Sequence, residues 1–376
     1  MFKSPKFIIS ALLVVVIILA SGCVFLACQW QSAPTGPEVI NQAWDLIFSN
    51  YIDNTKLDSE AMTQAALQAI INTIDDPHSV YMSKAQYEQF ITQLQGKYAG
   101  IGAVIALEDE KLVVTDIFAD SPAEKAGVQV GDEILEIDGE SVAGMSLNEI
   151  SEKMSGAANT TINLQIMHEN QTTPITLTIT RDYLNLPSVY YTMMDNIAYI
   201  GISHFTERTE AEIAPYISQL KTDNAEGIVI DLRGNTGGYL DIVIKVANHF
   251  IDEGVIVKVQ NSDGSMEIYE TDPDAEKTDL PIVILVDGLS ASGSEVFAGA
   301  LQDHGRAVLA GTLTYGKGSV NKFFQLGDGS AIYLTIARWL TPNDRLIEGQ
   351  GITPDFPLDL TGVDAVQWAI TYLNSN

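Results

Sequence analysis

The chain has 376 residues, a formal net charge of −29 and 46% hydrophobic residues. This length exceeds one ordinary hydrophobic core, so we expect two or more folded units, and the hydrophobic content excludes a disordered protein. The excess of 49 carboxylates over 20 Lys and Arg argues against nucleic-acid binding, because phosphates must be neutralised by basic residues. The only cysteines, Cys23 and Cys28, lie in the N-terminal apolar segment. The rest of the chain therefore has no disulfide, cysteine nucleophile or cysteine-based zinc site.

The N-terminal region, residues 1–37, contains one long apolar segment. From Phe7 to Cys28 the chain carries no charge, and two lysines precede this run. Its 22 residues are enough to cross a hydrocarbon core of roughly 30 Å, whereas the apolar part of a cleaved signal peptide has about 7–15 residues. Because lysines ahead of a span favour the cytoplasmic side, we predict a single-pass transmembrane helix and a short linker, with the remaining chain outside the cytoplasm. The sequence ASGC, ending at Cys23, also leaves open a lipoprotein signal.

Residues 38–96 have the pattern of a helical region. Apolar residues recur at helical spacing from Val39 and again from Met62. Ser83 followed by Gln86 is a capping box, which predicts the start of another helix. The sequence DDPHS between these segments predicts a turn.

Residues 97–183 consist of short alternating segments around one short helical pattern, which predicts a small half-β domain. Gly100, Ile101, Gly102 and Ala103 precede a strand. Two glycines flanking an aliphatic residue allow backbone N–H groups to converge in a nest that can hold a carboxylate. A strand beside such a nest can accept an extended peptide by edge addition. A glycine-rich turn without a ligand is the alternative.

Residues 184–362 have the pattern of an α/β core. The segments GIVIDL and PIVILVD are continuous apolar runs, as expected for strands covered on both faces, and they alternate with helical segments. A hairpin is expected over residues 321–337, and residues 363–376 predict a closing C-terminal helix. The predicted fold is therefore a multidomain α+β protein, with a helical region, a half-β domain and an α/β core after a transmembrane helix.

A serine-rich turn follows the strand PIVILVD and opens a helix. It contains Ser290, Ser292 and Ser294. A serine at a strand-to-helix turn lies near the positive end of the helix dipole, where a developing oxyanion is favoured. This turn is therefore a candidate nucleophile site, although simple helix capping explains the same serines.

A serine nucleophile needs a base, and Lys317 is the candidate. Its neighbours include Tyr315, Val320 and two glycines, with no carboxylate closer along the chain than Asp328. Burial in such surroundings lowers the pKa of a lysine and makes its amine a usable base. An exposed loop lysine is the alternative. None of the five histidines stands in a familiar nucleophile–histidine arrangement, although the sequence leaves a Ser-His-Asp triad open.

Two glycine-rich segments lie near these candidates. Residues 231–238, DLRGNTGG, follow a buried strand and precede a helix, so their glycines can expose N–H groups as an oxyanion hole or form only a tight turn. Residues 311–318 differ from a phosphate-binding P-loop, because Gly318 stands where Ser or Thr must bind magnesium. We expect no nucleotide binding there.

Taken together, six motifs resemble those of the C-terminal processing peptidases, also called tail-specific proteases, over residues 38–360. They occur in the order DDPHSVYM, YAGIGAVI, SPAEKAGVQVGDEILEIDG, DLRGNTGGYLD, SASGSEVFAGALQDHGRA and TYGKGSV. The resemblance implies that residues 97–183 form a PDZ domain. In that domain the N–H groups of residues 101–103 would meet a substrate C-terminus, and Ile150 and Met154 would line an apolar pocket.

The resemblance also implies a Ser-Lys dyad with the lysine 25 residues after the serine, which selects Ser292 and Lys317. Ser292 would attack the peptide carbonyl, Lys317 would take its proton, and the N–H groups of Gly238 and Gly293 would form the oxyanion hole. The chain departs from the family pattern twice. Asn321 stands where the family commonly has a glutamine that positions the lysine, and Gly293 stands where it usually has alanine.

We therefore expect a membrane-tethered serine endopeptidase of a bacterial cell, with its catalytic part outside the cytoplasm. Its PDZ domain would capture the C-terminal tails of unfolded or tagged proteins. Nothing in the sequence requires a metal or a cofactor, no nucleic-acid partner is expected, and homo-oligomerisation is left open. The alternative is a PDZ peptide-binding scaffold that keeps the fold but cleaves poorly.

Overall fold

The computed structural model describes residues 36–108, 111–169, 171–360 and 362–375. The chain separates into two compact units, residues 1–70 and 71–376. Within the described ranges, no helix is long and apolar enough to cross a membrane. The predicted span from Phe7 to Cys28, with the lipid-attachment candidate Cys23, lies outside the described residues.

The first unit is helical where it is described, as the sequence predicts. It contains α2 (Pro37–Asn50), η1 (Asn54–Lys56) and most of α3 (Ser59–Asn72). Pro37 opens α2 at the position where a missing N–H costs no helical hydrogen bond. Asp58 precedes α3, and its carboxylate accepts hydrogen bonds from the first-turn N–H groups of Glu60 and Ala61, both at 3.0 Å.

The second unit begins with a turn that reaches the α/β core. In this turn the Asp76 carboxylate accepts hydrogen bonds from His78 N at 3.0 Å and Ser79 Oγ at 2.6 Å. The turn leads into β1 (Val80–Met82) and α4 (Lys84–Leu94). The predicted capping box is confirmed, because Ser83 N donates to Gln86 Oε1 at 2.9 Å and Gln86 N to Ser83 Oγ at 3.4 Å.

The half-β domain forms one sheet with its own core. Its elements are β3 (Ala103–Glu108), β4 (Lys111–Ile117), α5 (Pro122–Ala126), β5 (Glu133–Ile137), β6 (Glu140–Ser141), α6 (Leu147–Met154), β7 (Thr161–Met167) and β8 (Ile175–Thr180). The strand order is β3-β4-β5-β7-β8, with β6 paired to β5, so β3 lies at an edge. Strands β2 (Lys97–Gly100) and β9 (Asp182–Asn185) pair with each other and bring the two ends of the domain together.

A second sheet carries the α/β core, in the order β10-β11-β12-β15-β16-β19. Its strands are β10 (Val189–Met194), β11 (Ile197–Ile202), β12 (Gly227–Asp231), β15 (Ile282–Val286), β16 (Ala307–Gly311) and β19 (Phe356–Pro357). Strand β10 pairs antiparallel with β11, and all other pairings in this sheet are parallel. Both β12 and β15 are buried along their whole length, which confirms that both faces are covered.

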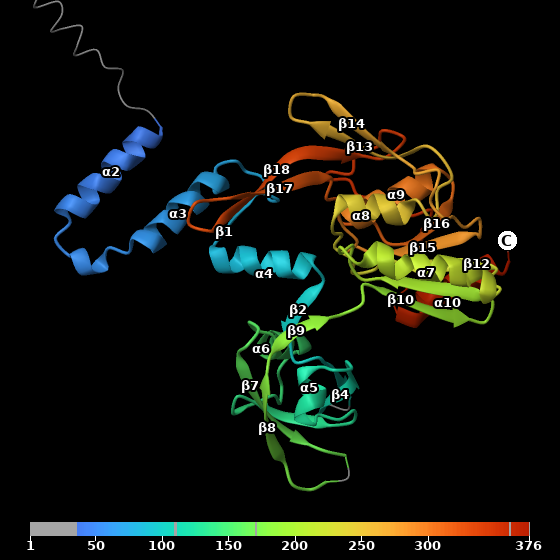
Figure 1. The fold of residues 1–376 in the computed structure, drawn as a ribbon, viewed down its shortest axis with the longest axis horizontal. Coiled ribbons are helices and arrows are strands. Elements are labelled where there is room, and N and C mark those ends of the chain that lie inside the picture. The colour runs from blue at the N-terminus through green and yellow to red at the C-terminus, as the bar shows by residue number, and fades with distance from the viewer. Residues whose placement is uncertain (1–35, 109–110, 170, 361, 376) are drawn as a thin grey trace, which may run out of the picture. The chain divides into compact units, whose positions relative to one another are not determined.

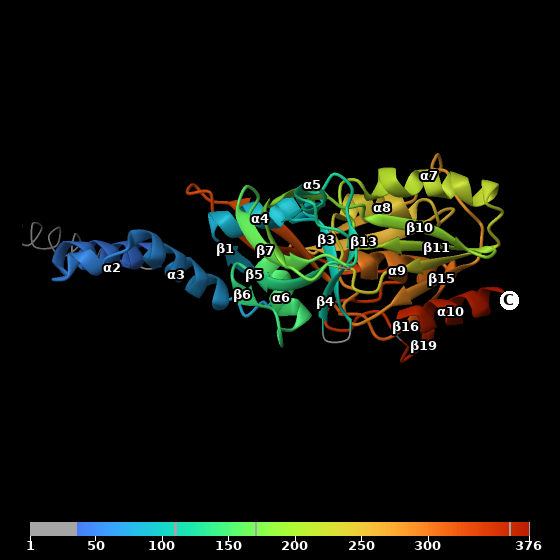
Figure 2. The same cartoon turned by 90° about the horizontal axis from the view of Figure 1, so that it is seen from below.

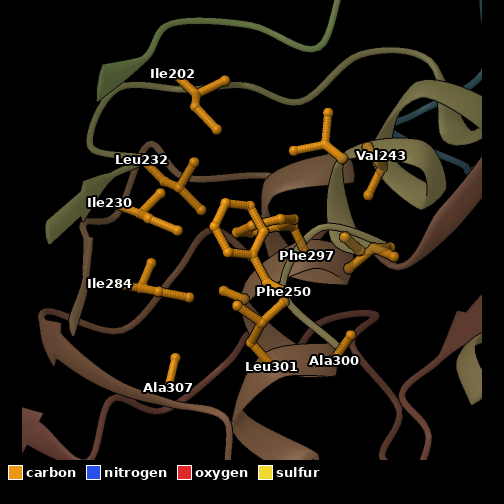
Figure 3. Packing of buried hydrophobic residues seen from close by; sticks show 14 of the residues in the cluster. Ile202, Ile230, Leu232, Val243, Phe250, Ile284, Phe297, Ala300, Leu301 and Ala307 are labelled. Atoms are coloured by element: carbon orange, nitrogen blue, oxygen red, sulfur yellow. The ribbon is translucent and has the colours of Figure 1, made fainter. Parts of the chain in front are cut away.

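Helices cover the two faces of this sheet. The helices α7 (Thr209–Thr222), α8 (Leu240–Ala247) and α9 (Gly293–Asp303) lie on one face, and α10 (Gly362–Leu373) lies on the other (Figure 2). Ile228 and Ile230 of β12 point into the larger core, on the side of α7, α8 and α9. Val229 between them points to the other face and packs with α10. Phe250 and Phe297 meet edge-to-face at 5.8 Å in the centre of the larger core (Figure 3).

A third sheet supplies the remaining side of the core. It has the order β1-β18-β13-β14, and β17 also pairs with β18. Its elements beyond β1 are β13 (Val255–Asn261), β14 (Met266–Glu270), β17 (Ser319–Gln325) and β18 (Ala331–Leu340). Strands β17 and β18 form the predicted hairpin, which Figure 1 shows beside β13. Trp339 of β18 reaches the same core as α9, so the start of β17 is held close to the parallel sheet.

Candidate active site

The serine-rich turn separates the roles of its three serines. Ser290 is fully buried and donates to Leu232 O at 2.8 Å, and Ser294 is fully buried and donates to Asn235 O at 2.8 Å. Ser292, the N-cap residue of α9, is partly exposed and has φ 53°, which is uncommon for a residue other than glycine. Only Ser292 of the three is therefore accessible to a substrate.

One buried carboxylate joins the Ser292 turn to the Lys317 loop. Glu295 is fully buried, and its Oε2 accepts hydrogen bonds from Ser292 N and from Lys317 N, both at 2.8 Å. The two amide nitrogens can therefore be no farther apart than twice that distance. Its Oε1 accepts from Gly316 N at 2.7 Å and Thr314 Oγ1 at 2.5 Å. Burial raises the pKa of Glu295, and these four hydrogen bonds oppose that rise.

Sequence reasoning missed Glu295. The signal was present, because Ser292 and Glu295 have the S-x-x-E spacing of a capping box. The local pattern indicates a helix start, but it does not reveal that the same carboxylate also binds the loop before β17. The turn can therefore cap helix α9 and also present a nucleophile, because Glu295 makes both sets of bonds.

Lys317 is partly buried and lies beside an aromatic cluster. Its Nζ is 5.4 Å from the ring centroid of Tyr333, which packs against Phe323 and Phe90. Burial lowers the pKa of Lys317, as the sequence predicted. The fold also brings carboxylates that oppose this effect, Glu348 most strongly, then Asp76 and Glu295. The sequence has no carboxylate close to Lys317 along the chain, but the fold brings three carboxylates near it.

The backbones of the two predicted dyad residues are held close together, but within the described ranges no hydrogen bond joins their side chains. Among the described residues, no hydrogen bond or ion pair involves Lys317 Nζ, and none joins it to Ser292 Oγ. Asn321 likewise makes no bond to Lys317 in this part of the chain. Its Nδ2 donates to His78 O at 3.0 Å and to Thr335 Oγ1 at 2.9 Å, and its Oδ1 accepts from Ser319 Oγ at 3.1 Å. The dyad and the role of Asn321 stay predictions.

The predicted oxyanion-hole glycines lie side by side. A Cβ on Gly293 would lie 3.3 Å from Gly238 N, and neither N–H group donates to an acceptor among the described residues. Gly238 has φ 154°, and a Cβ there would lie 2.0 Å from Phe205 O. A Cβ on Gly293 would also lie 2.9 Å from Val243 Cγ2. The valine methyl thus occupies the space that an alanine at Gly293 would need.

The loop that carries Gly238 is fastened to the nucleophile turn by buried polar groups. Asn235 is fully buried; its Nδ2 donates to Ile202 O at 2.8 Å, its Oδ1 accepts from Gly237 N at 2.8 Å, and its carbonyl accepts from Ala291 N at 3.0 Å. The Asp287 carboxylate accepts from Gly234 N at 3.0 Å. These bonds hold the two N–H groups in fixed positions, as electrostatic stabilisation of an oxyanion requires.

The geometry of the Lys317 loop also differs from that of a P-loop. A P-loop leads into a helix, whose N-terminus helps to hold the phosphates. Here Lys317 leads into strand β17.

Four histidines each have one ring nitrogen bound to a group outside the serine-rich turn. His168 contacts Asp132 at 2.6 Å, His249 and His304 contact backbone carbonyls, and His78 contacts Glu348 at 3.2 Å.

The predicted carboxylate-binding loop lies between β2 and β3. Gly102 has φ 81°, and a Cβ there would lie 2.4 Å from Ser121 Cβ. The N–H groups of Ile101 and Gly102 donate to no acceptor in the described ranges, while Gly100 ends β2 and Ala103 begins the edge strand. This arrangement is open to a carboxylate and an added strand. The apolar pocket near Ile150 and Met154 stays a prediction, since both side chains lie in the core of the domain.

Comparison with known families gives three matches in chain order. The N-terminal domain of the activating protease CtpB matches residues 28–86, a PDZ domain matches residues 113–166, and peptidase family S41 matches residues 196–358. The last of these ranges contains Ser292, Lys317 and both glycines predicted for the oxyanion hole.

Similar proteins cover most of the chain. The carboxy-terminal processing protease CtpB of Bacillus subtilis (strain 168) is 36% identical over 320 residues, which cover 84% of this chain and 66% of that protein. CtpA of the same organism is 35% identical, covering 88% of this chain and 71% of CtpA. The solved structure of a photosystem II D1 C-terminal processing protease is 28% identical with a TM-score of 0.55, covering 89% of this chain and 97% of that chain. The chain thus spans about two thirds of the length of these curated relatives.

Proposed function

Because the chain belongs to peptidase family S41, among the carboxy-terminal processing proteases, we propose that it is a serine endopeptidase with a Ser292–Lys317 dyad. The observation that carries this proposal is the Glu295 carboxylate, which holds the backbones of both residues on one oxygen. No structural need of helix α9 requires its capping carboxylate to bind a loop 22 residues away. A requirement to fix a nucleophile beside a base does explain it.

The proposed reaction uses the groups in their observed places. Lys317, whose pKa is lowered by burial, takes the proton from Ser292 Oγ through its neutral amine as the oxygen attacks the peptide carbonyl. The N–H groups of Gly238 and Gly293 stabilise the oxyanion. The Lys317 ammonium then gives its proton to the departing amine, and the peptide bond breaks to leave an acyl group on Ser292. A water molecule, deprotonated by Lys317, releases this acyl group.

An exposed apolar surface beside the turn supports an apolar substrate segment. Leu289, Leu313 and Tyr315 are 61%, 52% and 60% exposed, which is high for such large side chains. They lie on the two loops that carry Ser292 and Lys317, and Tyr315 N donates to Ser290 O at 3.0 Å. We propose that these residues contact apolar side chains of an unfolded substrate next to the cleaved bond.

We further propose that the PDZ domain captures the C-terminal tail of the substrate. The free N–H groups of Ile101 and Gly102 would bind the terminal carboxylate, and the tail would extend β3 as an added strand. The segment from Phe7 to Cys28 would tether the protein to the bacterial cell membrane, either as a span or through a lipid on Cys23, with the catalytic part outside the cytoplasm.

Cleavage of an unfolded protein that ends in an apolar tail tests the proposal. We expect the wild type to cleave, and Ser292→Ala and Lys317→Ala to be inactive while still binding the tail. Gly102→Ala should raise KM, because its Cβ would overlap Ser121, whereas Gly139→Ala, with the same φ of 81° and open space around it, should not. A wild type that binds the tail without cleaving it would favour the scaffold alternative, and activity that survives Lys317→Ala would refute the dyad.

A further inference from the structure

The loop after β18 packs directly on the backbone that carries Lys317. Gly349 N donates to Gly316 O at 2.9 Å. A Cβ on Gly318 would lie 2.2 Å from Glu348 N, so only glycine permits this approach. The backbone of Glu348 is therefore held against the residue that follows Lys317, and its side chain lies at the edge of the candidate site.

The two carboxylate oxygens of Glu348 have different surroundings. Oε1 is 3.2 Å from Nε2 of His78. Oε2 is buried and has no hydrogen-bond partner among the described residues. Buried polar atoms are nearly always paired, so an unpaired carboxylate oxygen needs an explanation. The nearby cation that lacks a partner is Lys317, whose Nζ makes no ion pair within the same described part of the chain.

We propose that Glu348 is a positioning residue for the dyad. Its carboxylate pairs with the Lys317 ammonium, which forms while Ser292 attacks. This inference rests on the proposed function. The proton leaves Ser292 Oγ and is bound by the neutral amine of Lys317, so the serine oxygen becomes the nucleophile and the lysine gains one positive charge. Glu348 Oε2 then receives the ammonium as its partner, and the pair separates when the proton passes to the departing amine.

The other groups around Lys317 cannot take this role as readily. The titratable groups that act on it are Glu348, Asp76, Glu295 and Tyr333, and His78 contacts Glu348. Glu295 already accepts four hydrogen bonds, and Asp76 accepts from Ser79 Oγ and His78 N. Glu348 also opposes the effect of burial on the pKa of Lys317 more strongly than either. A carboxylate with a free oxygen beside a developing cation stabilises the transition state in which that charge forms.

His78 holds this carboxylate through one oxygen and leaves the other free. The backbone of His78 is fixed in turn, because its carbonyl accepts from Asn321 Nδ2 at 3.0 Å. Asn321 thus acts on Lys317 indirectly, through His78 and Glu348. This gives a role to an asparagine at the position where the family commonly has a glutamine.

Two measurements on the full-length protein test the inference. The first is kcat and KM against pH for cleavage of the unfolded substrate. The second is labelling of Lys317 by acetic anhydride against pH, followed by mass spectrometry, which reports the neutral amine without any need for catalysis. The variants are Glu348→Gln, His78→Gln and His78→Ala. Glu253→Gln is the control, because it removes one exposed carboxylate away from the site. Melting curves verify that each variant folds.

Glu348→Gln should lower kcat at least tenfold with KM unchanged. The acid limb of the profile and the labelling midpoint should both move to lower pH, because loss of the anion makes the ammonium harder to form. His78→Ala should shift both in the same direction by less, and His78→Gln, which can still donate to Oε1, should restore most of the loss. Glu253→Gln should follow the wild type.

A lower kcat with an unchanged acid limb and labelling midpoint would overturn the inference, since a merely structural role would give that result. If the wild type cleaves at no pH, the proposed function fails, and the labelling midpoints still decide on the pairing. A lower midpoint in Glu348→Gln would support it, and an equal midpoint would overturn it.

Discussion

The two halves of the candidate site are built in opposite ways. On the nucleophile side, the polar side chains of Ser290, Ser294 and the fully buried Asn235 are all paired. On the base side, the described residues offer Lys317 Nζ an aromatic ring at 5.4 Å and unpaired carboxylate charge, but no hydrogen bond. The difference shows that the site is assembled through its backbone. Glu295 fixes the backbone of both residues. Among the described residues the Lys317 amine has no hydrogen-bond partner, and burial lowers its pKa.

Glu295→Gln should have the largest effect, because it removes what the two halves share. The amide nitrogen of glutamine would face two N–H donors if it replaced Oε2, and each buried N–H left unpaired costs about 1–3 kcal/mol. We expect cleavage to fall by about 10²-fold or more, and the free energy of unfolding to fall by about 1–3 kcal/mol for each of the two unpaired N–H groups. Enzyme assays and denaturant unfolding measure the two quantities, with Glu253→Gln as the control. Full activity in Glu295→Gln would show that the site does not depend on this carboxylate to join its two halves.

Gly238→Ala should damage the nucleophile side alone. Its Cβ would lie 2.0 Å from Phe205 O, so the loop must move and displace the Gly238 N–H group that we propose for the oxyanion hole. Loss of one such donor costs about 10²–10³-fold in kcat. Gly234→Ala is the matched control, because it lies in the same loop at φ 72° with open space around its Cβ. The kcat values of the two variants decide, and equal losses would mean that backbone strain alone is responsible.

Gly293→Ala should have a smaller effect that a second change reverses. The added methyl would lie 2.9 Å from Val243 Cγ2, and such overpacking costs about 1–3 kcal/mol. In Val243→Ala the space opens, so the double variant should recover both melting temperature and kcat relative to Gly293→Ala. A double-mutant cycle measures this coupling. Additive losses would show that glycine serves the backbone at this position and that its fit to Val243 is incidental.

Lys317→Met removes the proposed base and should abolish cleavage, but its effect on stability should be the smallest of these and should depend on pH. Burial lowers the pKa of Lys317, so the folded protein binds fewer protons than the unfolded chain between the folded and the unfolded pKa. Wild-type stability therefore rises with pH through that window, and the variant lacks this rise. Below the window the variant should melt at a higher temperature, and the difference should shrink as pH increases. A difference of about 1 kcal/mol corresponds to about 2–4 °C. A difference in melting temperature that stays the same at all pH values would contradict a lysine whose pKa is lowered by burial.

Much of the fold follows from local patterns in the sequence. The run LNEISEKM is an amphipathic helix with a Ser146 cap, and α6 covers those residues. Continuous apolar runs predicted β12 and β15 and their burial on both faces. Short strands such as β1, β2 and β9 were not predicted, because their pairing depends on partners far along the chain.

The same distinction explains what could be predicted of the site. Ser292, Lys317, Gly238 and Gly293 stand in recognisable motifs, and the structure brings their loops together. Glu295 had a local signal whose second function was invisible. The pair of His78 with Glu348 joins two loops that are far apart in the chain, so no spacing rule could have indicated it.

The most direct test of the account is covalent labelling of the serine. The full-length protein would be treated with a fluorophosphonate at several pH values, and the modified residue would be identified by mass spectrometry. We predict modification at Ser292, at a rate that rises with pH as Lys317 loses its proton, and no modification in Lys317→Ala. Modification at Ser290 or Ser294, or labelling of Ser292 at an unchanged rate in Lys317→Ala, would contradict the proposed dyad.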